Sequence, residues 1–211
     1  MSVNQLQRQL QDIYEVDIQH QVSDYLITCP SLAGDLAGTS VSGQKERLLF
    51  SQDTNELCLS LFLDDEVLRG IQDDNPLHDM QSFCLALEGV SHFLYLLWNA
   101  SFDRKITLLE LELQAEIDKF VMMVFVTQKQ DRRVEPSVFR KILFENTRLH
   151  EGLDSTQKER YARASRLAEK YCWKLESDYL SRRSRQEALS ELRQFYRLTQ
   201  AEKLRRIDQA H

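Results

Sequence analysis

Turn-forming residues are scarce in this chain, which has 3 prolines and 6 glycines among 211 residues. β-Sandwiches and β-barrels reverse direction at intervals of about ten residues and need turn residues at each reversal. A chain with so few of them is better suited to long helices joined by a limited number of loops. Because 42% of the residues are hydrophobic, the chain can also bury a substantial core. The sequence therefore predicts a mainly helical globular protein.

One stretch in the N-terminal part has the pattern of a β-hairpin. Residues 47–51 (RLLFS) and 56–63 (ELCLSLFL) flank a short polar connector, and every second residue of the latter is apolar. Residues 22–28 are also β-prone, whereas residues 31–44, with three of the glycines, are expected to form a loop. We therefore predict an α+β fold, mainly α, in which a small antiparallel sheet is followed by a multi-helix bundle.

The stretch LLELELQAEIDKFVMMVFV (residues 108–126) fits two patterns. Part of it alternates between apolar and polar residues like a half-buried strand, and its apolar residues also recur every three or four positions like those of a helix. At 19 residues it is longer than an ordinary strand, and Glu, Leu, Gln, Ala and Lys favour helices. We predict a helix with a solvent-exposed acidic face; the alternative is that this face is a docking surface. The face consists of Glu110, Glu112, Glu116 and Asp118.

Helices are also predicted before and after this stretch, first at 78–99 and later from Pro136 onwards. Three capping boxes mark helix starts in the last third of the chain. In this pattern a Ser or Thr hydroxyl accepts from the third helical amide, and a Glu three positions later reaches back. The predicted pairs are Thr156 with Glu159, Ser184 with Glu187 and Thr199 with Glu202. They predict helices at about 157–181, 185–198 and 200–209.

Charge is distributed unevenly along the chain. Residues 1–128 have 7 Lys and Arg against 20 Asp and Glu, a net charge of −13. Residues 129–211 have 20 against 13, a net charge of +7. A change in the sign of the net charge this large indicates that the chain consists of two structural modules. We predict an acidic α+β module at 1–128 and a basic helical module, or an appendage packed on it, at 129–211.

Glu88 and His92 raise the question of a metal site. They lie four positions apart, and therefore on the same face of the predicted helix at 78–99, and the next predicted helix supplies further glutamates. Four-helix carboxylate proteins use Glu-x-x-His on two helices and a Glu from each of two others. This chain has Glu-x-x-x-His once, so the favoured interpretation is a polar pair in an apolar helix, with no cofactor. A carboxylate/His metalloprotein is the second alternative.

Basic residues follow the predicted helix at 157–181 at helical spacing, and SRRSR (181–185) and KLRR (203–206) add positive charge. Such a stripe can bind an acidic protein surface, which is the leading hypothesis, or the phosphates of RNA or DNA. Because acidic residues are interleaved with the basic ones, a third interpretation is a solvated helix face with local ion pairs. The candidate partner-binding residues are Arg160, Arg163, Arg166, Lys170, Lys174, Arg182 and Arg183.

Sequence signatures of catalysis are missing. There is no G-x-S-x-G, no P-loop, no G-x-G-x-x-G and no zinc-deaminase pattern. An enzyme therefore has no positive support in the sequence, and we expect a non-catalytic interaction or regulatory protein with a protein partner.

Cysteine usage and hydropathy bear on the compartment. The four cysteines have no C-x-x-C spacing, which predicts reduced and mostly buried thiols in a cytoplasmic protein. The N-terminus lacks the features of a signal peptide. The longest apolar stretches, 93–98 and 120–126, are far shorter than the about 20 residues that span a bilayer, so no membrane contact is expected. Oligomeric state stays open, because exposed and buried apolar stripes look alike in a sequence.

Overall fold

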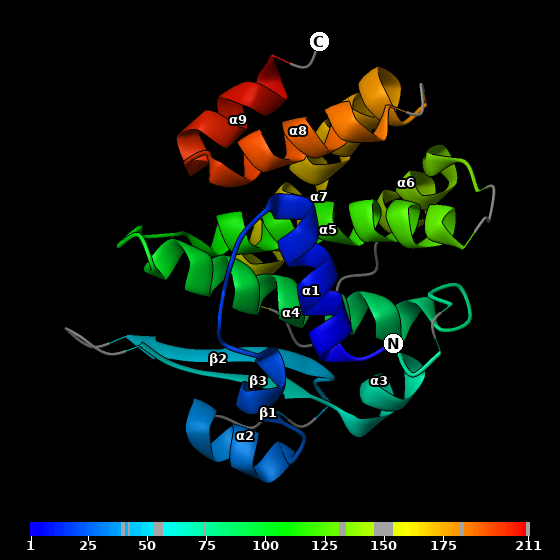
Figure 1. Cartoon of the computed structure of the whole chain (residues 1–211). Coiled ribbons are helices and arrows are strands. Elements are labelled where there is room, and N and C mark those ends of the chain that lie inside the picture. Colours follow the sequence, from blue (N-terminus) through cyan, green and yellow to red (C-terminus); the bar gives the residue numbers. More distant parts are fainter. Residues whose placement is uncertain are drawn as a thin grey trace.

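A small sheet and a stack of helices make up the fold in this computed structural model, so the predicted mainly α, α+β class is confirmed (Figure 1). The structure describes residues 1–38, 41, 43–52, 57–73, 75–130, 134–145, 154–181 and 184–209. The strands are β1 (Leu26–Ile27), β2 (Glu46–Gln52) and β3 (Leu57–Leu63). The helices are α1 (Val3–Tyr14), α2 (Pro30–Ala37), α3 (Asp65–Gly70), α4 (Met80–Ala100), α5 (Leu108–Lys129), α6 (Pro136–Phe144), α7 (Ser155–Leu175), α8 (Arg185–Arg197) and α9 (Gln200–Asp208). A 3-10 turn (Val22–Tyr25) precedes β1, and a π-helical turn (Glu176–Leu180) extends α7.

The sheet has the strand order β1-β3-β2. β2 and β3 form the predicted antiparallel hairpin, with Leu49 opposite Ser60. β1 pairs with β3 in parallel, so the sheet is mixed and the prediction of a purely antiparallel sheet is wrong in this detail. Because α2 and β2 lie between β1 and β3 in the chain, these two strands are not joined by a tight turn and can run in the same direction.

The predicted loop at 31–44 is wrong in its first half, where α2 forms. Pro30 occupies the first turn of α2, a position that needs no amide hydrogen. Gly38 ends the helix with φ 63°, the left-handed conformation that glycine adopts most readily. The glycine that seemed to mark a loop therefore marks the end of a helix.

The elements form successive layers (Figure 1). α2 packs against β1 and β2 on one side of the sheet, and α4 packs against β2 and β3 on the other. α5 lies along α4, and α7 lies along α5. α1 contacts both α4 and α8, and α9 contacts α7, so the C-terminal helices close the stack above α5.

Helix α5 is buried on almost every side because α4 and α7 both cover it. The prediction that this stretch is a helix is confirmed, but the prediction of an exposed acidic face is wrong. Glu110, Glu112 and Asp118 are only 4%, 6% and 1% exposed, and Glu116 is half-buried. The physical reason is that α7 packs over the side that the sequence pattern had left to solvent. Arg160 of α7 lies 3.7 Å from Glu112, and Lys119 of α5 pairs with Glu116.

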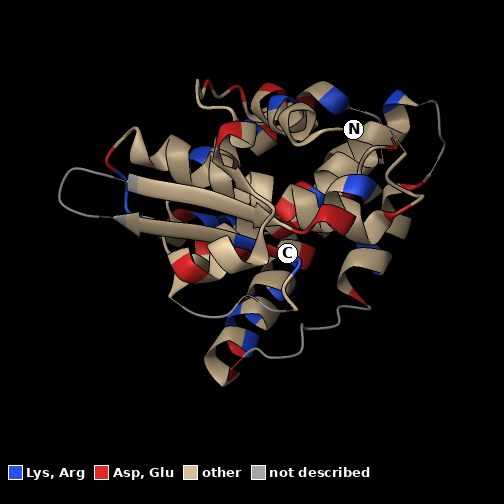
Figure 2. Cartoon of the chain, turned by 90° about the horizontal axis from the view of Figure 1, so that it is seen from below, with Lys and Arg blue, Asp and Glu red and all other residues tan. Residues whose placement is uncertain are grey.

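The two parts of opposite net charge share one hydrophobic core, which extends from Val3 to Ile207. Ion pairs also cross between them: Arg193 of α8 lies 2.7 Å from Glu15 and donates a hydrogen bond to the carbonyl of Ile13. Basic and acidic residues are accordingly mixed over the ribbon (Figure 2). Among the helices of the described residues, none combines the length and the apolar character that crossing a bilayer requires.

All four cysteines are free thiols. Cys172 is buried and Cys84 is partly buried, but Cys29 and Cys58 are exposed. The prediction that most of the thiols are buried is therefore wrong. Cys29 lies at the N-cap of α2 and Cys58 lies on β3, both at the outer end of the stack.

Candidate functional site

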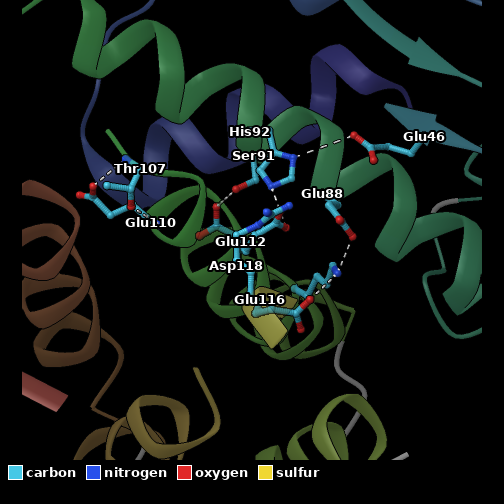
Figure 3. A network of polar contacts seen from close by, with 11 residues as sticks. Glu46, Glu88, Ser91, His92, Thr107, Glu110, Glu112, Glu116 and Asp118 are labelled. Atoms are coloured by element: carbon cyan, nitrogen blue, oxygen red, sulfur yellow. Dashed lines mark hydrogen bonds and ion pairs between the residues drawn. The ribbon is translucent and has the colours of Figure 1, made fainter. Parts of the chain in front are cut away.

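Carboxylates and one imidazole from three elements converge between the sheet and α5 (Figure 3). Glu46 begins β2, Glu88 and His92 lie one turn apart on α4, and Glu112 lies on α5. Nε2 of His92 is 3.6 Å from Oε2 of Glu112, and Nδ1 of His92 is 4.0 Å from Oε1 of Glu46. Ligand atoms of Glu88, His92 and Glu112 all lie within 4.8 Å of one another. We call these four residues the Glu/His cluster.

Two cationic side chains border the Glu/His cluster. The Lys119 ammonium is 2.6 Å from Oε2 of Glu88 and 2.8 Å from Oε1 of Glu116. Nε of Arg160 is 3.7 Å from Oε1 of Glu112. All of these side chains are largely buried, so their charges interact in a medium that screens them less than water does. Arg160, predicted from its spacing as part of a partner-binding stripe, points into this interior site instead.

Several polar atoms of this region have no hydrogen-bond partner in the described part of the chain. They are Oε1 of Glu46, Nε2 of His92 and Nε of Arg160. The separations of 3.6–4.0 Å that connect them to their neighbours are too long for hydrogen bonds. Buried polar atoms without a partner cost about 1–3 kcal/mol each, which makes the group a candidate for binding something else.

The ionisation of the cluster is strongly perturbed. Burial raises the pKa of Glu46 to about 8, and the neighbouring charge of Glu88 adds to the effect. Burial alone would lower the pKa of His92, but the proximity of Glu112, Glu46 and Glu88 outweighs it and raises this pKa to about 9. At neutral pH the site therefore retains two protons that ordinary Glu and His side chains would largely have lost.

A second buried network surrounds Asp118 on α5. The Asp118 carboxylate accepts hydrogen bonds from the Tyr14 hydroxyl, from Oγ of Ser91 at 2.6 Å and from Nε2 of Gln114 at 2.9 Å. The Lys203 ammonium donates to Oε1 of Gln114 at 2.8 Å, which links α9 to the same group. Burial raises the pKa of Asp118 to about 6 and lowers that of Lys203 to about 7.

This second network could not be recognised in the sequence. Lys203 belongs to the KLRR segment, which looks like an exposed basic stretch. The only feature of the sequence that indicates burial of Lys203 is its position four residues before Ile207, on the face of α9 that is buried. Its hydrogen bonds tie α1, α4, α5 and α9 together, so it is a structural centre more than a binding site.

The remaining residues of the predicted basic stripe have different surroundings. Arg163 and Arg166 are exposed and form no ion pair with any described residue. Lys170 lies 3.5 Å from Asp208, and Lys174 lies 3.1 Å from Asp178. Arg182 and Arg183 lie outside the described residues.

One exposed aromatic residue on α7 was missed. Trp173 is 48% exposed, and it lies seven positions after Arg166 and three after Lys170, so the three side chains share a face. Its spacing from the basic residues was visible in the sequence, but nothing there distinguished it from a core tryptophan.

Glu110 is separate from the Glu/His cluster. Its carboxylate accepts from the backbone amide of Thr107 and the Thr107 hydroxyl accepts from the amide of Glu110, a capping box that begins α5 (Figure 3). Of the three glutamates predicted to form one acidic face, one therefore caps the helix, one joins the cluster and one pairs with Lys119.

Comparisons of the chain with protein-family models, with curated proteins and with solved structures found no match.

Proposed function

We propose that this protein is a non-catalytic binding protein that docks an acidic surface of a protein partner on the exposed face of α7. The observation that carries the proposal is the exposure of Trp173 in line with Arg163, Arg166 and Lys170. We call these four residues the α7 face. Trp and Arg dominate the binding energy of protein interfaces, because both combine a large contact area with directional polar groups.

The charges on α7 favour a protein over a nucleic acid as the partner. Glu159 is exposed four positions before Arg163, so the N-terminal end of the same face is acidic and would repel a phosphate backbone. The whole chain has a net charge of −6, which also opposes the approach of RNA or DNA. A protein can match both signs and place an apolar pocket around Trp173. Nucleic-acid binding is the second outcome that the experiment below can give.

The proposal places the protein in the cytoplasm. Cys29 and Cys58 are exposed free thiols, which a reducing compartment keeps from oxidation.

The experiment is affinity purification from the native cell, with and without nuclease, followed by binding measurements on the captured molecule. The test variants are R163A/R166A/K170A and W173A. The matched control is R8A/R69A/K105A, which removes the same number of positive charges from exposed residues outside α7. Far-UV circular dichroism of each variant checks that the fold is retained.

A protein that survives nuclease, is lost with both test variants and is retained by the control is the expected result. With the purified partner, W173A should weaken binding by at least about tenfold even at high salt, because its contribution is apolar and salt does not screen it. RNA or DNA capture, with affinity falling steeply and linearly in log salt and little effect of W173A, would overturn the proposal in favour of nucleic acid. Equal binding by all variants would mean that the α7 face is only solvated.

A further inference from the structure

The Glu/His cluster has the donor set of a metal site. Three residues, Glu88, His92 and Glu112, bring ligand atoms within 4.8 Å of one another from two adjacent helices. Metal–nitrogen and metal–oxygen bonds of about 2.0–2.2 Å place two ligand atoms of one ion about 3–4 Å apart. The 3.6 Å between Nε2 of His92 and Oε2 of Glu112 fits two atoms that share an ion and is too long for a hydrogen bond. We infer that this protein binds a divalent transition-metal ion through Glu88, His92 and Glu112.

The unpartnered atom of His92 supports this inference independently of the acidic residues. His92 is 7% exposed, and its Nε2 has no hydrogen-bond partner among the described residues although it faces Glu112. Once this nitrogen gives up its proton it offers a lone pair, so a divalent ion would bind here in place of that proton. Figure 3 shows the ring between Glu46 on one side and Glu112 on the other.

Glu46 has the position of a residue that orients the imidazole. Its Oε1 lies on the Nδ1 side of His92, at 4.0 Å, opposite the nitrogen that faces Glu112. In metal sites a ligating His usually presents its other ring nitrogen to a carboxylate or carbonyl, which holds the tautomer and the ring in place. Glu46 is therefore a positioning residue from the sheet, and the two helices supply the ligands.

The balance of charge is consistent with a divalent ion. Four carboxylates meet here, those of Glu46, Glu88, Glu112 and Glu116, and two side chains bring positive charge, Lys119 and Arg160. With all four carboxylates ionised and His92 neutral, two negative charges are left uncompensated in a buried site, which is costly. One divalent cation would neutralise them. The competing state is a metal-free network in which protons compensate the same charges.

The chemistry of the donors limits the choice of metal. One imidazole nitrogen together with carboxylate oxygens suits Mn²⁺, Fe²⁺ or Zn²⁺, whereas Mg²⁺ and Ca²⁺ favour oxygen ligands alone. The two cysteines that are not exposed, Cys84 and Cys172, do not belong to the group of possible ligands, so a thiolate ligand is not expected. Mn²⁺ and Zn²⁺ are stable in air and serve as the probes.

The test is calorimetric titration of the full chain with Mn²⁺ and with Zn²⁺ after treatment with a chelator. The wild type should bind close to one equivalent of at least one of the two ions. H92Q and E112Q should each weaken binding by at least about tenfold, and E46Q should weaken it less, as expected for a positioning residue. The matched controls are H78Q, an exposed histidine, and E110Q, a buried glutamate on the same helix; both should bind like the wild type.

The assignment of this metal site is contradicted if the wild type binds neither ion, or if folded H92Q and E112Q bind as tightly as the wild type. Circular dichroism in the presence of chelator shows whether the variants are folded. If they are not, X-ray absorption at the metal edge of the loaded wild type decides: one imidazole nitrogen with oxygen ligands is expected, and a shell without imidazole or with sulfur contradicts the assignment. The variant R163A/R166A/K170A should bind the metal normally, so this inference and the proposed α7 face fail independently.

Discussion

Lys203 donates a 2.8 Å hydrogen bond from its ammonium group to Oε1 of Gln114, and both residues are completely buried. The ammonium also donates to the Tyr95 hydroxyl at 3.0 Å and lies 4.5 Å from the centre of that ring. Neutral acceptors and aromatic faces thus surround a group that normally carries a charge. Burial of a charge without a directly paired opposite charge is unfavourable, so the stability of the protein should depend on the protonation of Lys203.

The first prediction concerns the pH dependence of stability. Burial lowers the pKa of Lys203 from 10.5 to about 7, so between these values the unfolded chain binds more protons than the folded chain. The contribution of Lys203 to the free energy of unfolding therefore rises with pH across this window. From pH 7 to pH 9 the wild type should gain on the order of 2 kcal/mol relative to K203M, measured by urea unfolding.

The charged groups that act on Lys203 are present in both proteins; they are Glu110, Asp118 and Arg104. A difference in stability between wild type and K203M that stays constant from pH 6 to pH 9 would show that Lys203 does not titrate in this range.

The second prediction concerns the hydroxyl of Tyr14. Y14F removes the donor to the buried Asp118 carboxylate and leaves the ring stacked on Tyr196, with centroids 4.1 Å apart. Hydrogen bonds to a charged, buried acceptor are worth about 1–3 kcal/mol, so the free energy of unfolding should fall by that amount. Y25F is the matched control, because the hydroxyl of Tyr25 bonds to His20 near the surface. A loss in Y25F as large as that in Y14F would contradict the role of burial.

The third prediction concerns the close packing of α4 on the sheet. A methyl group at Gly89 would lie 2.6 Å from Cδ1 of Leu61 and 3.2 Å from Oε1 of Glu46. Ala favours a helix over Gly by about 1 kcal/mol, but overpacking against a fully buried leucine costs about 1–3 kcal/mol. G89A should therefore lower the midpoint of thermal unfolding. In the double variant L61A/G89A the loss should be smaller than the sum of the two single losses, and simple additivity would refute the steric explanation.

The fourth prediction compares two helix starts. The Thr107 hydroxyl accepts from the amide of Glu110, whereas the Ser184 side chain makes no capping hydrogen bond, contrary to the capping box that the sequence predicts there. T107A should cost about 1 kcal/mol of stability, and S184A should cost much less. Thermal unfolding of both variants measures the difference. A larger effect of S184A would mean that the first turn of α8 is capped in solution.

Local interactions explain which parts of the fold were predictable. The capping box of Thr199 and Glu202 forms where the sequence places it, and the hairpin of β2 and β3 follows from alternation on either side of a polar connector. Helix α5 was also predictable, because residue propensities and length outweighed its strand-like alternation. In each case the residues that decide the structure are near one another in the chain.

Tertiary packing decided what those elements do. Glu112, Arg160 and Lys203 have charged side chains that sequence rules place in solvent. All three are largely buried because α7 packs along α5 and α9 packs on α7. Glu46 meets His92 only because the sheet packs against α4, although the two residues are 46 positions apart in the chain. Periodicity records which side chains share a face of a helix or strand. Contacts between distant segments decide what covers that face. They therefore decide whether a charge there is solvated, paired or able to bind an ion, and local sequence patterns do not reveal these contacts.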